Sequence, residues 1–522
     1  MASSHNGASE QDAGEQVPSL TRCRHIPINC EMGICMQTDE HADDSLLLQP
    51  SANPSADQAG AVEGSPPPLA LDVRTKALLE ASVVPLLLRL AWPNILLMLA
   101  QSSTGLIEMW WVARLGTDAL TGMALVLPVL ILMQNMSQGA MGGGISSAIA
   151  RALGGGRRAE ADRLVLHALV INAALGLLFS ITVLLIGPLL FTALGGRGAS
   201  LRAALTYANI IFAGMVLLWV FNALGSIIRG TGNMLVPGMV FGGGALLLIP
   251  LSPCLIFGIG PFPAMGIAGG GLALLVYYAA GTVILGWYVA SGRNLARFRW
   301  TRLRWAPLRN ILAVGAVAAV NTVQINVTIA VTMALVAAHA GTAAVAGFGT
   351  GTRLEYLLPP LAFGLGAPLV TLVGTNIGAG QPKRALRIAI IGGCLAFSMT
   401  EIIGLAAAFW PGAWLGLFGH DPAMVATGTA YLHIVAPLYG FFGLGIALYF
   451  ASQGAGRLGW PLIGGLVRML VGIGGGWVAL RLTDSLSWLF AVYALGIFLY
   501  GVVITTAVTS GSWFRTAAKR SP

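Results

Sequence analysis

The sequence repeats itself at a constant distance of 224 positions, and this duplication constrains the possible folds more than any other feature. The stretch 140–160 reappears as 364–384, with glycines at matching positions in both copies. Nine identities share the same offset: Gly142 and Gly366, Gly154 and Gly378, Gly156 and Gly380, Ala161 and Ala385, Arg163 and Arg387, Tyr207 and Tyr431, Gly230 and Gly454, Gly232 and Gly456, and Pro237 and Pro461. A long internal period of this kind indicates two homologous halves with the same architecture.

Both halves consist of long apolar segments. The 522 residues are 56% hydrophobic and 9% charged, whereas a soluble domain has about 25% charged residues. A helix needs about 20 apolar residues to cross about 30 Å of hydrocarbon, and these runs lack the alternation of membrane β-strands. Twelve segments are long enough: 84–113, 118–150, 162–195, 203–228, 233–258, 264–291, 308–338, 343–376, 384–412, 423–452, 459–481 and 485–510. The sequence therefore predicts an all-α membrane protein with twelve transmembrane helices, six in each repeat.

Basic residues are concentrated in alternate loops. One set of loops, with the C-terminus, contains Arg157, Arg158, Arg163, Arg229, Arg293, Arg297, Arg299, Arg302, Arg304, Arg309, Lys383, Arg384, Arg387, Arg457, Arg515, Lys519 and Arg520; the other contains Arg114, Arg197, Arg202 and Arg481. The positive-inside rule predicts that the first set of loops and both termini are cytoplasmic. We expect the protein in the plasma (inner) membrane. The halves are then parallel repeats around a central cavity, an arrangement typical of secondary transporters.

The ends of the chain differ from its apolar middle. Twelve of the 20 Asp and Glu residues lie in the first 80 positions, so the basic total reflects membrane loops and does not indicate nucleic-acid binding. We predict a disordered cytoplasmic tail over 1–75, six-helix lobes over 76–300 and 301–512, and a cytoplasmic tail over 513–522. Cys23, Cys30 and Cys35 lack the C-x2-C spacing of a zinc site, so no metal or other cofactor is expected.

Several motifs resemble one transporter family. RGTGN (229–233), QGAGR (453–457), LIFGIGPFPAMGIAGGG (255–271) and GTRLEYLLPPLAFGLGAPLVTLVGTNIGAGQ (351–381) are similar to segments of the multidrug and toxic compound extrusion (MATE) family, nearest to its bacterial DinF-like members. The resemblance covers about residues 84–510. It implies a two-lobe bundle that exports organic cations, drugs or other toxic compounds by alternating access, in antiport with H⁺ or Na⁺. We also expect a monomer surrounded by membrane lipid.

The sequence departs from the family at the positions that bind the coupling ion. DinF-like members have a carboxylate in the first span, and the residue at that position here is Glu108. Their fifth span carries an Asn and an Asp, but the segment here reads LSPCLIFG, so Leu248 and Ser252 stand there instead. The NorM-like branch uses carboxylates in spans 7 and 10, and these spans contain none in this sequence. Other membrane carboxylates therefore become candidates.

Glu355 is the first candidate for binding the coupling proton or cation. A charged group in hydrocarbon costs a few kcal/mol or more, so each one requires a reason. Glu355 lies near the centre of its span, and Pro359 and Pro360 deprive nearby carbonyl groups of their helical hydrogen bonds. A broken helix beside a carboxylate is typical of transporter ion sites. The structural alternative is a kink together with a salt bridge.

Glu108 and Glu401 are the other coupling candidates. Glu108 is followed directly by Trp110 and Trp111, so the alternative is a position at the outer edge of the membrane. Glu401 lies in the middle of its span and either relays protons or forms a buried structural pair with Arg468. The sequence leaves these alternatives open.

Polar and flexible side chains in the spans are candidates for the substrate cavity: Asn321, Gln324, Arg353, Tyr356, His433, Met98 and Met109. Polar residues of this kind also hold membrane helices together, and methionine is common in cores, so a structural role is the alternative. The repeat glycines Gly154, Gly156, Gly378 and Gly380 are expected to form tight turns at the inner face, where the backbone needs positive φ.

Two other functions fit parts of the pattern. A flippase for lipid-linked precursors could share the two-lobe architecture, but it would favour a cationic cavity. Only Arg353 and Arg468 are plausible central cations, against three central glutamates. A membrane enzyme is disfavoured because HExxH, GxxxxGK[ST] and GxSxG motifs are absent from the sequence. We therefore expect a transporter that is not an enzyme.

Overall fold

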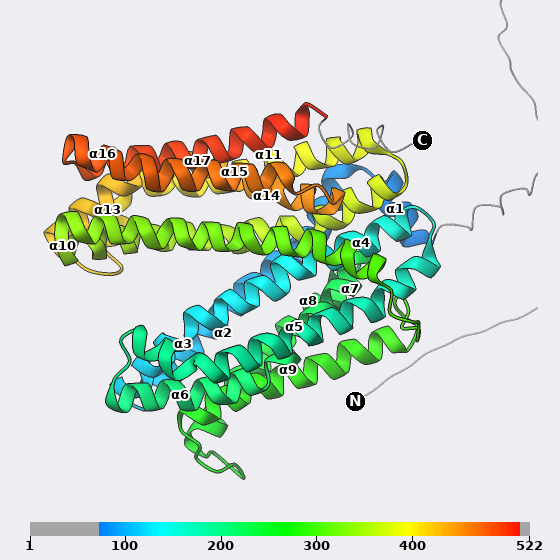
Figure 1. Ribbon diagram of the computed structural model, residues 1–522, viewed down its shortest axis with the longest axis horizontal. Coiled ribbons are helices and arrows are strands. Elements are labelled where there is room, and N and C mark those ends of the chain that lie inside the picture. The colour runs from blue at the N-terminus through cyan, green and yellow to red at the C-terminus, as the bar shows by residue number, and fades with distance from the viewer. Residues whose placement is uncertain (1–71, 512–522) are drawn as a thin grey trace, which may run out of the picture. The chain divides into compact units, whose positions relative to one another are not determined.

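The structure, a computed structural model, describes residues 72–511, apart from the side chains of 97, 99–104, 106, 342, 356, 357, 359 and 360. The tail cysteines, the expected tails up to 71 and from 513, and the side chain of Tyr356 lie outside the described residues. All regular elements in the described range are helices (Figure 1). They belong to one compact unit, Pro66–Pro522.

The first repeat contains α1 (Val73–Glu80), α2 (Val83–Ala113), α3 (Thr117–Gln134), the π-helix η1 (Asn135–Met141), α4 (Gly142–Gly154), α5 (Arg158–Ala193), α6 (Gly198–Ala213), α7 (Met215–Gly230), α8 (Leu235–Phe257) and α9 (Ile267–Ala290). The second contains α10 (Trp305–Gly378), α11 (Pro382–Phe409), α12 (Pro411–Leu415), α13 (Pro422–Val435), the 3₁₀-helix η2 (Ala436–Leu438), α14 (Tyr439–Ala455), α15 (Gly459–Met469), the π-helix η3 (Leu470–Gly475), α16 (Gly476–Thr483) and α17 (Leu486–Thr509).

Twelve membrane spans follow from these helices. Ten helices in the described residues are long and apolar enough to cross a membrane, or eleven when the bent pair α6 and α7 counts as one span. The 31-residue helix α2 supplies the remaining span. α10 comprises two spans that meet at Gly341, whose φ of 75° and ψ of −168° are accessible to glycine. The prediction of an all-α bundle with six spans in each repeat is confirmed.

Helix starts in the second repeat follow from local sequence. The side chain of Asp421 accepts a hydrogen bond from the backbone nitrogen of Met424 at 2.8 Å and thereby caps α13. Pro382, Pro411 and Pro422 begin α11, α12 and α13. Proline suits this position because its missing N–H would have no helical partner in the first turn.

The helix break expected beside Glu355 is not present. α10 remains helical through Pro359 and Pro360, and Gly341 is the residue with non-helical angles within it. A proline inside a helix removes one backbone hydrogen bond, but its usual effect in a packed bundle is a bend and not an unwound segment. An ion site at Glu355 would therefore depend on side chains and not on freed carbonyl groups.

Two hydrophobic cores divide the helices into two lobes. Figure 1 shows α3, α5, α6, α8 and α9 in one bundle, the N-lobe, and α11 and α13 to α17 with α10 in the other, the C-lobe. Leu87 of α2 packs into the core of the C-lobe, whereas Ile311, its repeat equivalent at the start of α10, packs into the core of the N-lobe. Each lobe therefore holds the beginning of the other lobe's first span, and this exchange ties the lobes together at one end.

The lobes approach most closely where α4 crosses the second half of α10. A Cβ atom at Gly154 would overlap the carbonyl oxygen of Thr375, and a Cβ atom at Gly378 would overlap the carbonyl oxygen of Arg151. Both positions therefore require glycine. Gly378 follows Gly154 by 224 residues, as Thr375 follows Arg151, so each half makes the same contact with the other. The crossing is a pseudo-twofold interface within one chain.

Side chains from both lobes reinforce this crossing. Arg151 Nη1 donates a hydrogen bond to the carbonyl oxygen of Gly454 at 2.8 Å. Gln453 Nε2 donates to the carbonyl oxygens of Gly139 and Ala140, at 3.2 and 3.3 Å, in the π-helix η1. π-helical segments within α-helices are often found at functional sites. We call the surface formed by residues 139–154, 364–378 and 450–456 the interlobe seal.

The four repeat glycines serve two different purposes. Gly156 and Gly380 follow α4 and α10 with φ values of 71° and 70°, as expected for tight turns. Gly154 and Gly378, by contrast, are the last residues of their helices, and they do not have positive φ. Their lack of a side chain allows the close crossing of the lobes and is not needed for a turn.

Gly378→Ala is expected to part the lobes at the interlobe seal, because its Cβ atom would collide with backbone; overpacking of this kind costs about 1–3 kcal/mol. The reporter is Ser147→Cys, a fully buried position on α4, in a chain whose five cysteines have been replaced by alanine. Its reaction with a water-soluble maleimide should be faster in Gly378→Ala. Gly243→Ala is the matched control, because a Cβ atom there meets nothing within 4 Å. Equal rates in the two variants would contradict the steric role of Gly378.

Candidate functional site

Glu355 of α10 lies in a closed network of buried polar side chains in the C-lobe. Its Oε1 accepts a hydrogen bond from Arg468 Nη2 at 2.5 Å, and its Oε2 accepts from the hydroxyl groups of Tyr431 and Tyr493 at 3.0 and 2.9 Å. All four side chains are at most 2% exposed. They come from α10, α15, α13 and α17 in that order. The carboxylate is therefore neutralised by a cation and has hydrogen bonds at both oxygens.

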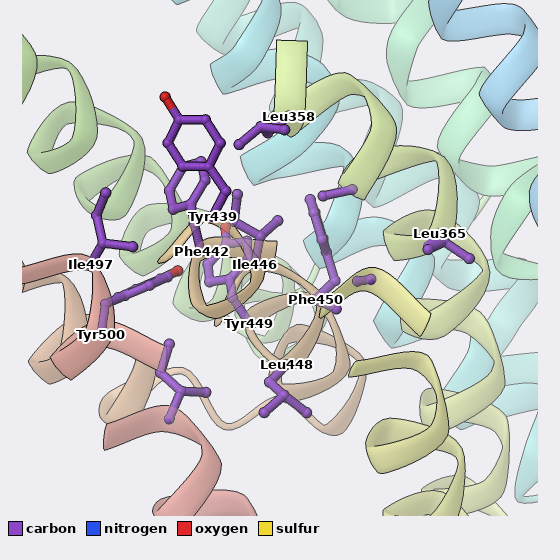
Figure 2. Close-up of a cluster of buried hydrophobic side chains, with 14 of the residues drawn as sticks. Leu358, Leu365, Tyr439, Phe442, Ile446, Leu448, Tyr449, Phe450, Ile497 and Tyr500 are labelled. Carbon is purple, nitrogen blue, oxygen red and sulfur yellow. The ribbon is translucent and has the colours of Figure 1, made fainter. Parts of the chain in front are cut away.

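The cation of this network rests on the aromatic core shown in Figure 2. The Arg468 guanidinium carbon lies 4.5 Å from the ring centre of Phe442. Figure 2 places Phe442 among Tyr439, Tyr449 and other side chains of α14, with Tyr500 of α17 beside them. An aromatic face attracts a cation by about 2 kcal/mol when both are desolvated. The Glu355–Arg468 pair therefore has the properties of a packed structural element.

Glu108 of α2 is a buried carboxylate of the N-lobe, and unlike Asp162 of α5 it has no ion pair among the described residues. Its side chain is 5% exposed, and its Oε1 has no hydrogen-bond partner among the described atoms. Tyr207 of α6 and Tyr278 of α9 lie close enough to interact with its charge. Tyr207 is the repeat equivalent of Tyr431. Each lobe thus places this tyrosine near a buried carboxyl group, which a different helix supplies in each lobe.

The sequence left open a buried structural pair between Glu401 of α11 and Arg468. The structure does not contain this pair. The cation pairs with Glu355, and Glu401 is half-buried. Its Oε2 accepts a hydrogen bond from the backbone nitrogen of Gly440 at 2.6 Å, in the first turn of α14. A carboxylate at this position satisfies an N–H group that has no partner within the helix. Glu401 therefore fixes the start of α14 after the 3₁₀ segment η2.

Asn321 and Gln324 lie together inside the C-lobe. They are 4% and 5% exposed, and a Cβ atom at Gly465 would meet the side-chain oxygens of both. Both Gln324 polar atoms and the Asn321 oxygen have no hydrogen-bond partner among the described atoms. These two residues therefore form a buried polar cluster between α10 and α15, within the C-lobe.

The other residues proposed for the substrate cavity are dispersed. Arg353 is exposed, with its guanidinium 5.1 Å from the ring centre of Phe418. His433 is also exposed. Met98 belongs to the core of the N-lobe, and Met109 packs against that core. The structure therefore does not bring these residues together with Asn321 and Gln324 around one cavity.

The distribution of basic residues in the sequence led to a wrong position for Arg229. Its position among basic residues suggested a loop, but it lies in the last turn of α7 and is 3% exposed. Its backbone carbonyl accepts a hydrogen bond from Thr371 of the C-lobe at 2.9 Å. Its side chain lines a narrow cavity between the lobes, together with Gln138, Ser226 and Gln453. Polar side chains of both lobes meet in this cavity.

The internal repeat could have indicated that Arg229 lies between the lobes. Gln453 follows Arg229 by 224 residues, and each precedes one of the paired glycines Gly230 and Gly454. Two residues at equivalent positions of the repeats are related by the pseudo-twofold axis. If each of them faces the opposite lobe, the two residues lie close together near that axis. Polar residues at one such pair of positions therefore indicate a shared interlobe site, whereas the charge pattern alone indicates a loop.

Comparison with known proteins agrees with the duplicated architecture. A family model described as MatE matches the chain twice, over residues 93–254 and 318–478, once in each lobe. An FAD transporter from Shewanella oneidensis is 30% identical over 387 residues, which cover 72% of this chain and 82% of that protein. A probable multidrug resistance protein NorM from Thermotoga maritima is 24% identical over 355 residues, or 68% of this chain and 75% of that protein.

Solved structures share the fold. A MOP superfamily transporter from Pyrococcus furiosus, described as having a binding pocket of reverse polarity, superimposes with a TM-score of 0.78 at 20% identity over 87% of this chain and 100% of that chain. An outward-facing multidrug resistance MATE transporter superimposes with a TM-score of 0.76 at 21% identity over 86% and 100%. With a family model that matches both lobes and a relative at 30% identity, the chain belongs to the MATE family of multi-pass membrane transporters and is not an enzyme.

Proposed function

We propose that the protein is a secondary active efflux transporter that exchanges protons for a small-molecule substrate by alternating access, with Glu108 as the proton-carrying group. The observation that carries this proposal is that Glu108 is buried without a cation partner among the described residues and with an unpartnered oxygen. An ionised carboxylate in such surroundings loses its hydration without compensation. Proton binding removes that cost, so the burial of Glu108 and its protonation are coupled.

Glu355, which the sequence favoured for this role, is less suited to it. A proton on its carboxylate would have to displace Arg468 and would leave a buried cation without a counter-ion. Glu401 already accepts a backbone hydrogen bond at a helix start. We therefore assign structural roles to these two carboxylates and retain Glu108 as the group that titrates during transport.

The interlobe seal represents one end state of the transport cycle in this proposal. It lies beside the loops that carry Arg157, Arg158 and Arg457. By the positive-inside rule we place this end in the cytoplasm, together with both termini, in the inner membrane. The described conformation is then closed to the cytoplasm. A monomer contains both lobes and thus all parts that the cycle requires.

The relatives supply two substrate classes to compare. One relative is an FAD transporter, and others are probable multidrug resistance proteins. We propose an amphipathic small molecule as substrate, either an organic cation or a nucleotide-like compound such as FAD. The coupling step at Glu108 is the same for both classes, because Glu108 lies in the core of one lobe and not in the interlobe cavity.

Glu108→Gln is expected to abolish transport driven by a pH gradient, because the amide keeps the shape of the side chain but does not titrate. The measurement is substrate flux in proteoliposomes, with FAD and ethidium as probes and with pH and Na⁺ gradients imposed separately. Glu401→Gln is the matched control and should retain transport. Wild-type rates in Glu108→Gln would contradict the assignment. Flux that responds to Na⁺ and not to pH would contradict proton coupling.

Loss of either partner of the Glu355–Arg468 pair is expected to destabilise the C-lobe by about 3–5 kcal/mol, because the remaining charge stays buried without compensation. The measurement is thermal unfolding of the purified Glu355→Gln and Arg468→Gln variants. The double variant should be more stable than either single variant, since it leaves no unpaired charge. Additive losses in the double variant would show that the two side chains act independently.

Cysteine labelling checks the orientation. Arg302→Cys replaces an exposed residue between α9 and α10, and His420→Cys replaces an exposed residue between α12 and α13. In a cysteine-free background, a membrane-impermeant maleimide should modify His420→Cys in intact cells and Arg302→Cys only in inverted vesicles. The opposite pattern would reverse the proposed topology, and labelling of both positions from one side would exclude it.

A further inference from the structure

Arg229 carries a charge that the described protein does not balance. Its side chain is 3% exposed, and none of the ion pairs among the described residues includes it. Its Nη2 donates to Ser226 Oγ at 3.1 Å, whereas its Nη1 has no hydrogen-bond partner among the described atoms. Its guanidinium carbon lies 5.7 Å from the ring centre of Phe241 and 5.9 Å from that of Phe363. This contrasts with Arg468, which pairs with a carboxylate.

The cavity beside Arg229 is equipped to bind a negative charge. It is lined by Gln138 and Ser146 of the N-lobe and by Gln453 of the C-lobe. The Gln138 Nε2 atom is buried and has no hydrogen-bond partner among the described atoms. Two unused donors, one of them cationic, and one unused acceptor, Gln453 Oε1, therefore lie around one cavity. No described carboxylate forms part of its lining.

The fold itself does not require a cation at this position. Gln453 occupies the equivalent place in the second repeat, and it satisfies its donors by binding backbone carbonyl oxygens of the opposite lobe. A neutral amide is thus sufficient to join the lobes. A buried guanidinium instead opposes closure of the interlobe seal, because it loses hydration and gains no counter-charge.

We propose that Arg229, with Gln138 and Ser226, binds an anion as the interlobe seal closes. The anion is either a small free ion such as chloride or a phosphate or carboxylate group of the transported substrate; both offer the same chemistry to the guanidinium. Binding supplies the missing counter-charge, so the anion stabilises the closed seal over the open one. The proposal rests on the alternating access proposed above.

This site gives the transporter a substrate-dependent step. When the seal opens, Arg229 is exposed to the cytoplasm on the proposed topology and can attract an anionic group. When the seal closes with the anion bound, the positive charge of Arg229 is buried together with the negative charge that balances it. Closure without an anion carries the full cost of desolvating the guanidinium. Anion binding and closure are therefore coupled, and each favours the other.

The test measures seal closure directly and needs no transport. The reporter is again Ser147→Cys in the cysteine-free chain, purified in lipid nanodiscs in a sucrose-balanced HEPES buffer of low anion content. The rate of its reaction with a water-soluble maleimide is measured after addition of sodium chloride or of AMP. Arg229→Gln removes the charge, Arg229→Lys keeps it, and Arg158→Gln is the matched control because it removes an exposed arginine.

We expect at least one anion to slow labelling by about fivefold or more, the lower end of usual coupling between sites. The effect should be absent in Arg229→Gln, present but weaker in Arg229→Lys, and unchanged in Arg158→Gln. A response to chloride identifies a free ion, and a response to AMP alone identifies a substrate group. No response to either probe, or an equal response in Arg229→Gln, would overturn the proposal. If an anion still slows labelling in Glu108→Gln, anion binding at Arg229 does not depend on proton binding at Glu108, and the two proposals can fail separately.

Discussion

The close crossing of α4 with the second half of α10 is the contact on which the arrangement of the two lobes depends. Gly154 and Gly378 allow the backbones to touch, and a side chain at either position would force them apart. Around this crossing lie the hydrogen bonds of Arg151 and Gln453 to the opposite lobe. In the proposed cycle this contact opens, while the two hydrophobic cores lie within the separate lobes. Such a contact suits a transporter that alternates between two states.

Three of the buried charged side chains differ in what balances their charge, and this difference separates their roles. Glu355 is neutralised by Arg468 and two tyrosines, so it stabilises the C-lobe. Glu108 has no cation partner among the described residues, so a proton is its natural compensation. Arg229 lies between the lobes without a counter-charge, so an anion is its natural compensation. In our proposals the proton and the anion thus act at separate places, one within a lobe and one at the seal.

Much of the fold could be predicted from the sequence, because it follows from local composition and from the repeat. Twelve apolar segments fix the spans, and the positive φ of Gly156 and Gly380 follows from the requirement for tight turns after α4 and α10. The break expected at Pro359 and Pro360 was wrong, because helix packing can retain a bent helix where local rules predict unwinding. The close approach at Gly154 and Gly378 was not foreseen, since the neighbouring atoms belong to the other half of the chain.

The sequence by itself determined that this chain is a duplicated, twelve-span transporter with buried carboxyl groups, because hydrophobic length, loop charge and internal repetition are properties of the chain alone. Only the tertiary structure decided which charges are paired. Arg468 faces Glu355 and not Glu401, and Arg229 is buried between the lobes and not solvated in a loop. The physical reason is that spacing along one helix fixes the face on which a side chain lies. The partner on that face depends on how helices from distant parts of the chain pack together.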